Sequence, residues 1–354
     1  MSWGKHPIQR RAVRRNPLTR NESSMQHSSK RRLRRLTATA RRIALFFTGR
    51  QSGDWVEGSY IEPDRTVFSL AHPNAKRHYG LHLPAGYAAG KSWPLVVMLH
   101  GCKQDALAFA AGTRMNEIAD REGFLVLYPE QRRLANAYRC WNWFDASAQR
   151  SGGEAALLAG MVREVTATYA VDPRRVYIAG ISAGGAMASV MVNCYGQLFA
   201  ACAVHSGLMY RAAESGSQAM RAMRQGSMAS PQNTARKDSA LVPALVIHGS
   251  SDDTVHPINA DQLIEQFVAM SGHGAKSEAR LTVTTRNEAG GDGHPYATSD
   301  YHHGDQLRLR KVLVEGLGHA WSGGNAEHAF NDSTGPDASR MVWDFFSGFE
   351  RPPI

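Results

Sequence analysis

Cysteine is scarce in this sequence, with four residues among 354. Cys102, Cys140, Cys194 and Cys202 allow three complete pairings, and the sequence alone does not choose among them. Their spacing matches none of the ligand patterns of zinc sites.

Long apolar runs are also missing. No stretch approaches the roughly 18 residues that a membrane-spanning helix requires, which predicts a chain that does not cross a membrane. The apolar residues 43–47 are too few for the core of a secretory signal, and no clear cleavage site follows them. The paired arginines before them suggest a twin-arginine signal, but the apolar segment is again too short. The sequence by itself therefore assigns no compartment.

Acidic residues are nearly absent from the start of the chain. Residues 1–50 hold 14 lysines and arginines but one acid, Glu22, whereas residues 51–354 have a net charge of −3. The formal net charge of +10 thus belongs to a basic arm, residues 1–50. We predict this arm to be disordered, because like charges repel and it has little apolar surface to bury. It is either a solvated tail, which we favour, or a binding segment for nucleic acid or an anionic surface.

From about residue 51 the sequence alternates short apolar strands with helices. Strands are predicted at residues 79–84, 94–99, 124–128, 175–180, 200–204, 243–247, 281–285 and 307–314, and helices at 105–122, 154–169, 257–270 and 337–348, with a further helix after Gly184. This alternation predicts one α/β domain over residues 51–354, with a mainly parallel sheet covered on both faces.

Two segments interrupt the alternation. Residues 207–240 are rich in Ser, Met, Arg and Gln and form an insert, either a lid over a site or a mobile loop. Residues 286–306 are predicted to be a second loop, rich in Gly, His and Asp. We interpret its polar side chains as surface residues rather than metal ligands: His294, Asp300, His302, His303 and Asp305.

The most informative stretch is Gly180-Ile-Ser-Ala-Gly184, between a predicted strand and a helix rich in Ala and Met. It fits the Gly-x-Ser-x-Gly nucleophile elbow, whose serine is held at a sharp strand-to-helix turn. We predict a strained backbone at Ser182, and collisions with neighbouring backbone for any side chain at Gly180 or Gly184. Without the flanking strand and helix, the motif would indicate only a glycine-rich turn.

A serine nucleophile needs a base, and the base needs a carboxylate. Asp252 follows the strand at 243–247 and His319 follows the strand at 307–314. Serine, acid and histidine thus come in the order that this elbow requires, with Asp253 as the neighbouring alternative for the acid. We predict Ser182 as nucleophile, His319 as base and Asp252 as the acid that orients it.

Acyl transfer also needs two N–H donors for the oxyanion. Ala183, directly after the nucleophile, supplies the first. Cys102, in the loop after the strand at 94–99, supplies the second, and Gly101 lets that backbone turn inward.

Five motifs carry a more specific signal: Leu99-His-Gly-Cys-Lys-Gln104, Tyr128-Pro-Glu-Gln131, Cys140-Trp-Asn-Trp-Phe144, Gly180-Ile-Ser-Ala-Gly-Gly185 and Gly316-Leu-Gly-His-Ala-Trp321. Together they resemble the poly(3-hydroxybutyrate) depolymerase-type esterases, a family that includes feruloyl-type esterases, over about residues 75–348. The resemblance implies the α/β-hydrolase fold and an extracellular or periplasmic location. It also favours Asp252 over Asp253, because the acid of this family follows a strand and His-Gly-x-x.

The resemblance further implies a disulfide between Cys102 and Cys140, which would brace the oxyanion loop. Cys194 and Cys202 would then pair, or stay free and buried.

Three tryptophans are candidates for lining the acyl or alcohol pocket, with core packing as the equal alternative: Trp141, Trp143 and Trp321.

Secreted polymer depolymerases of the family carry a linker and a polymer-binding domain after the catalytic domain, whereas this chain ends at Ile354, soon after the last predicted helix. We therefore expect soluble oligomers or small esters as substrates, not crystalline polymer.

The leading hypothesis is a serine carboxylesterase that needs no cofactor or metal. It would hydrolyse short-chain hydroxyalkanoate oligomers or small or aromatic esters through an acyl-enzyme. The alternatives are an acyltransferase or serine peptidase with the same triad, or a binding protein tethered by its basic arm to nucleic acid or an anionic granule surface.

Overall fold

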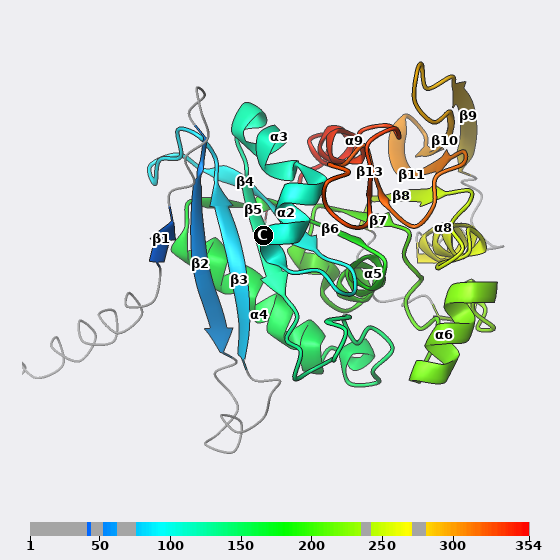
Figure 1. Ribbon diagram of the computed structural model, residues 1–354, viewed down its shortest axis with the longest axis horizontal. Helices are drawn as coiled ribbons and strands as arrows, with labels where there is room; N and C mark the ends of the chain where they lie inside the picture. The colour runs from blue at the N-terminus through cyan, green and yellow to red at the C-terminus, as the bar shows by residue number, and fades with distance from the viewer. Residues whose placement is uncertain (1–40, 44–51, 62–75, 235–241, 271–280, 354) are drawn as a thin grey trace, which may run out of the picture. The chain divides into compact units, whose positions relative to one another are not determined.

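The computed structural model describes residues 41–43, 52–61, 76–234, 242–270 and 281–353 (Figure 1). The basic arm predicted at residues 1–50 lies outside the described residues except for a short strand, β1 (Arg41–Ile43), which pairs antiparallel with β2 (Asp54–Ile61). None of the helices in the described part of the chain is long and apolar enough to span a lipid bilayer.

One large sheet forms the centre of the described domain. From edge to edge its strands are β1, β2, β3 (Lys76–Leu83), β5 (Leu125–Glu130), β4 (Trp93–Leu99), β6 (Val171–Ile181), β7 (Ala201–His205), β8 (Ala244–Gly249), β11 (Gln306–Val314), β10 (Tyr296–His303) and β9 (Thr282–Glu288). The strands from β5 to β11 in this order are parallel, and antiparallel pairs extend the sheet at both ends. This is the predicted α/β-hydrolase architecture, and the parallel order brings the carboxyl ends of β4, β6, β7, β8 and β11 to one edge.

Helices cover both faces of the sheet (Figure 1). One face is covered by α4 (Gly153–Thr168), α5 (Ala183–Tyr195) and α8 (Ile258–Met270), and the other by α2 (Ala106–Thr113), α3 (Met115–Glu122) and α9 (Ala338–Phe346). The remaining elements are the helices α6 (Gly216–Gln225) and α7 (Pro231–Thr234), the short turns η2 (Ala148–Arg150) and η3 (Gly196–Leu198), and a small sheet of β12 (Trp321–Ser322) and β13 (Asn331–Asp332).

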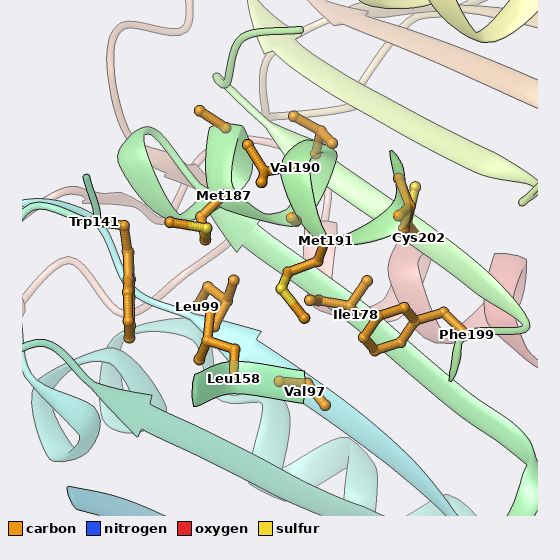
Figure 2. Close-up of a cluster of buried hydrophobic side chains, with 14 of the residues drawn as sticks. Val97, Leu99, Trp141, Leu158, Ile178, Met187, Val190, Met191, Phe199 and Cys202 are labelled. Carbon is orange, nitrogen blue, oxygen red and sulfur yellow. The ribbon is translucent and has the colours of Figure 1, made fainter. Parts of the chain in front are cut away.

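The core is divided between the two faces by strand alternation. On β4, Val97 and Leu99 point toward α4 and α5, whereas Val96 and Met98 point toward the opposite layer. Figure 2 shows the first cluster, which contains Val97 and Leu99 of β4 together with Met187 and Met191 of α5. Burial of each such side chain stabilises the fold by about 1.5–3 kcal/mol, so this packing holds the central strands in place.

The helix predicted at 105–122 is wrong in one respect, because the structure has two helices there. Arg114 separates α2 from α3 with a left-handed backbone, φ 57°. Its guanidinium then pairs with Glu117 in the first turn of α3. Apolar spacing continues through the break, so periodicity alone did not reveal it.

The loop predicted at 286–306 is also wrong, because β10 lies within it and β9 extends into its start. The alternation at residues 281–285 predicted only the first half of β9, and the polar residues that follow it carry no apolar alternation. His302 and His303 belong to β10, and the described residues contain no group of three His, Cys, Asp or Glu side chains placed to hold a metal ion.

The insert predicted at 207–240 is folded as far as the structure describes it. The Met223 carbonyl at the end of α6 accepts the His256 N–H at 2.7 Å. Gln266 of α8 donates to the Tyr210 carbonyl at 2.8 Å and to the Thr234 hydroxyl at 2.7 Å. These bonds fasten residues 207–234 to α8 and to the loop after β8, whereas residues 235–241 lie outside the described residues.

Asp300 on β10 is buried and accepts hydrogen bonds from Arg310, at 2.5 and 2.8 Å, and from Arg286 at 2.9 Å. Burial would raise the pKa of its carboxyl, but these bonds outweigh burial and hold the pKa below its usual value. A depressed folded-state pKa means that this cluster stabilises the protein above about pH 4, the ordinary Asp value, and that the stabilisation is lost as pH falls through the folded-state pKa.

Asp300→Asn should therefore lower the free energy of unfolding at pH 7 by about 1–3 kcal/mol. The difference from the unsubstituted protein should shrink as the pH is lowered toward 3, since the native carboxylate then takes up a proton. Urea unfolding across this pH range measures it, and a deficit that stays constant would contradict the assignment.

Candidate active site

Ser182 sits at the junction where β6 ends and α5 begins. Its backbone has φ 57° and ψ −123°, a conformation that strains a residue other than glycine by about 1–3 kcal/mol. The Ser182 N–H donates to the His205 carbonyl at 2.9 Å, and its carbonyl accepts the Ala186 N–H at 2.9 Å. The strained turn predicted from the sequence is confirmed, held between the neighbouring strand and the first turn of α5.

The two glycines of the motif are required by space. A Cβ on Gly184 would lie 2.1 Å from the Leu99 carbonyl oxygen and 2.5 Å from that of His100. A Cβ on Gly180 would lie 2.5 Å from the backbone of Gly184. The predicted collisions are therefore real, and they show how closely the elbow packs on the end of β4.

Asp252 follows β8 and is buried, with its carboxylate held from several sides. Oδ1 accepts the N–H groups of Val255 at 2.8 Å and Thr254 at 3.0 Å, and Oδ2 lies 2.8 Å from Nδ1 of His319. Burial would raise the pKa of Asp252, but the hydrogen bonds from His319 and Val255 outweigh it and hold the pKa below its usual value. Asp253 is exposed, so of the two adjacent acids only Asp252 is placed to orient the histidine.

His319 stands on the loop after β11, which is fastened to the loop after β8. The Ser251 N–H donates to the Leu317 carbonyl at 3.0 Å, and the Gly316 N–H donates to the Ser250 hydroxyl at 2.9 Å. Because Nδ1 of His319 is engaged by the carboxylate, Nε2 is the nitrogen left for proton transfer.

His205, at the end of β7, connects the serine to the histidine loop. Its carbonyl accepts the Ser182 N–H, and its ring stacks on Trp321, two residues beyond His319, with centroids 5.1 Å apart. Within the described part of the chain the Ser182 hydroxyl makes no hydrogen bond to His319, so the structure joins Asp252 to His319 directly and brings Ser182 to the same edge through His205.

Two buried histidines at this edge were missed by sequence reasoning. Burial lowers the pKa of His205 to about 3, assisted by the nearby His248 and His319, so His205 is neutral; its Nε2 accepts the Ser322 N–H at 3.2 Å. Burial also lowers the pKa of His248, whose Nε2 lies 2.7 Å from the Val255 carbonyl. His205 is the last residue of β7 and His248 lies one residue before the end of β8, and a place near a strand end gave no role to either in the sequence.

The oxyanion loop, His100-Gly101-Cys102, lies against the elbow. A Cβ on Gly101 would meet Ile181, the residue before Ser182, at 3.4 Å. Among the described residues, neither the Cys102 N–H nor the Ala183 N–H is donated to a protein acceptor. Both are thus available for a developing oxyanion.

A second loop, residues 131–142, holds the oxyanion loop from outside. The disulfide Cys102–Cys140 that the resemblance implied is present, and the Lys103 N–H donates to the Tyr138 carbonyl at 2.7 Å. Cys194 and Cys202 are free, and burial raises the pKa of the Cys202 thiol.

Removing the disulfide by Cys140→Ser should lower the free energy of unfolding by about 2–4 kcal/mol, because the closed loop spans 38 residues. We also expect kcat to fall by about tenfold as Cys102 gains freedom. Cys194→Ser, which removes a free thiol, is the matched control. Urea unfolding measures the stability of both variants, and ester hydrolysis measures their kcat. If Cys194→Ser lost as much stability and kcat as Cys140→Ser, the role of the disulfide in bracing the loop at Cys102 would be contradicted.

The three tryptophans predicted as candidate pocket walls lie in the core. Trp141 and Trp321 are 0% and 1% exposed, and Trp143 is 3% exposed. Trp141 donates its ring N–H to the His100 carbonyl at 3.1 Å, and Trp321 donates to the Ser339 hydroxyl at 3.1 Å. Figure 2 shows Trp141 within the buried cluster. Their burial favours core packing, the alternative prediction.

The chain is similar to several known proteins in sequence and in fold. The family model described as "Esterase PHB depolymerase" matches residues 77–291. The chain belongs to this family of esterases. Poly(3-hydroxyalkanoate) depolymerase C of Paucimonas lemoignei is 34% identical over 247 residues, 67% of this chain and 57% of that protein. Feruloyl esterase B of Neurospora crassa is 27% identical over 240 residues, 64% of this chain and 77% of that protein.

The esterase family therefore has named members with different ester substrates, and the chain spans little more than half of the length of the depolymerase. Among solved structures, acetyl xylan esterase from Aspergillus awamori superposes with a TM-score of 0.60 at 21% identity, covering 77% of this chain and 94% of that one. A ferulic acid esterase from Anaeromyces mucronatus gives 0.52 at 12% identity, covering 86% and 93%. These structural matches show the fold.

Proposed function

We propose that this chain is a serine carboxylesterase that works through an acyl-enzyme, with Ser182, His319 and Asp252 as its triad. The observation that carries the proposal is the strained Ser182 at the sheet edge where the buried Asp252 holds His319 at 2.8 Å. A strained serine at the end of a central strand and an oriented histidine on a later loop are what nucleophilic acyl transfer requires.

In the first half-reaction, the Ser182 Oγ bonds to the carbonyl carbon of the ester while its proton passes to Nε2 of His319. Asp252 stabilises the imidazolium through the Nδ1 hydrogen bond, and its lowered pKa keeps the carboxylate ionised for this task. The N–H groups of Cys102 and Ala183 bind the oxyanion. The tetrahedral intermediate then breaks its bond to the alcohol oxygen, which takes the proton from His319.

Deacylation repeats these steps with water. His319 removes a proton from water as its oxygen bonds to the acyl carbon, and returns that proton to Ser182 Oγ as the acid leaves. Neither half-reaction changes an oxidation state or requires a cofactor.

The proposed substrates are short-chain hydroxyalkanoate oligomers or small or aromatic carboxylic esters. The support comes from relatives named as a poly(3-hydroxyalkanoate) depolymerase and a feruloyl esterase, and an extracellular or periplasmic location remains our prediction from the same resemblance. The alternative of a binding protein tethered to nucleic acid or an anionic surface depends on the basic arm, residues 1–50. Almost all of this arm lies outside the described residues.

A turnover panel tests the proposal. We expect measurable hydrolysis of hydroxybutyrate oligomers, methyl ferulate or acetylated xylose sugars, and no comparable cleavage of the matching amides. Faster amide cleavage would indicate a peptidase, and transfer to added alcohols in preference to water would indicate an acyltransferase. Absence of turnover on every ester would overturn the proposal.

A further inference from the structure

Glu154, in the first turn of α4, is the centre of a buried polar junction behind the oxyanion loop. Its Oε1 accepts hydrogen bonds from Arg77 at 3.0 Å, Gln131 at 2.6 Å and the Asn142 side chain at 2.9 Å. Its Oε2 accepts the Asn142 backbone N–H at 2.8 Å. One carboxylate thus joins β3, the end of β5, the segment 140–142 and α4.

The negative charge of the Glu154 carboxylate is compensated by the positive charge of the neighbouring Arg77 guanidinium. Arg77 is fully buried and Glu154 is 6% exposed, so removing either would break an ion pair between two buried groups. The carboxylate also sits near the amino end of α4, where the helix dipole favours negative charge. A neutral residue at position 154 could not accept four donors in this way.

Two short paths lead from Glu154 to the oxyanion loop. The first runs through Gln131, whose backbone N–H donates to Nε2 of His100 at 3.0 Å, and whose side chain donates to the Cys140 carbonyl at 3.0 Å. Because Nε2 accepts, Nδ1 of His100 carries the proton and donates to the Gly101 carbonyl at 2.7 Å. Burial lowers the pKa of His100 to about 4, which keeps it in this neutral form.

The second path runs through the segment Cys140-Trp141-Asn142. Glu154 fixes Asn142, Trp141 donates to the His100 carbonyl at 3.1 Å, and Cys140 is covalently joined to Cys102. Both paths therefore end on the residues that present the Cys102 N–H.

We propose that Glu154 is a positioning residue for the reaction: through Gln131 and Asn142 it sets the direction of the Cys102 N–H toward the oxyanion. The inference rests on the proposed function, in which that N–H is an oxyanion donor. Glu154 touches neither Ser182 nor the pair Asp252–His319, so its effect falls on the oxyanion and leaves the general base alone. Gln131 and Asn142 belong to the motifs Tyr128–Gln131 and Cys140–Phe144, which this role explains.

Glu154→Gln tests the proposal, because the variant keeps the size of the side chain and loses its charge and part of its accepting capacity. We expect kcat/KM for p-nitrophenyl butyrate to fall by about 10- to 100-fold, mainly through kcat, since one misdirected oxyanion donor has effects of that order. The inhibition constant of butylboronic acid, whose tetrahedral adduct places an oxygen in the oxyanion site, should weaken by a similar factor. The pH dependence of kcat/KM should not move.

The matched control is Asp300→Asn, which also breaks a buried carboxylate–arginine cluster but has no path to Cys102. It should lose stability and keep both boronate affinity and kcat. Should Glu154→Gln fail to fold, Asn142→Ala provides a milder test, with an expected loss of about 3- to 10-fold in the same two measurements.

Unchanged boronate affinity in the folded Glu154→Gln variant, or in Asn142→Ala, would overturn the inference. A fall in kcat without the parallel weakening of boronate binding would do the same. Retained activity in Ser182→Ala would instead refute the proposed function, so the two failures are distinguishable.

Discussion

Replacing Ser182 with alanine should lower kcat for p-nitrophenyl butyrate by about 10⁶-fold, because loss of the nucleophile ends the covalent pathway. The residual rate would come from the oxyanion donors acting on water. Alanine preserves the Cβ and keeps the N–H bond to His205, so the elbow should keep its shape.

Circular dichroism and urea unfolding check that the Ser182→Ala protein stays folded, and single-turnover assays at high enzyme concentration reach the required sensitivity. Ser206→Ala is a suitable control, since this neighbouring serine is buried beside His205 and has no role in the proposed chemistry. A Ser182→Ala enzyme with more than a few per cent of the original kcat would refute the nucleophile assignment.

Asp252→Asn should lower kcat by about 10⁴-fold. The amide would turn its N–H₂ group or its oxygen toward His319 and would no longer stabilise the imidazolium or fix the tautomer with the proton on Nδ1.

The adjacent Asp253→Asn is the matched control, since Asp253 is exposed and its removal changes the local charge by the same amount. Its kcat should stay within about twofold, as expected for a surface substitution. Equal losses in the two variants, measured from pH 6 to pH 9, would contradict the choice of Asp252.

Local signals were enough to predict the elbow and the chain order of the three proposed triad residues. The strand before Ser182 is apolar, its flanking glycines exclude side chains, and Asp252 and His319 each follow a strand of the parallel sheet. The positions of parallel strand ends are fixed by the fold class, so convergence at one edge followed from the pattern. The disulfide came from the family resemblance, since cysteine spacing left the pairings open.

Features that depend on distant partners were not predictable in the same way. Glu154 looked like one more polar residue in an amphipathic helix, because its partner Arg77 lies 77 positions earlier in the chain. The burial of Trp321 depends on packing against His205 and Phe109, which no local pattern records. The strand β10 was hidden because its residues, Tyr296–His303, are mostly polar and show no apolar alternation.

Covalent labelling tests the central assignment most directly. Diethyl p-nitrophenyl phosphate should inactivate the protein with release of one p-nitrophenolate per chain, and mass spectrometry of the digest should find one diethylphosphoryl group on the peptide that contains Ser182. His319→Ala should slow this labelling strongly, because the base no longer takes the serine proton. Inactivation with the label on another residue, or full activity after stoichiometric labelling of Ser182, would contradict the acyl-enzyme mechanism.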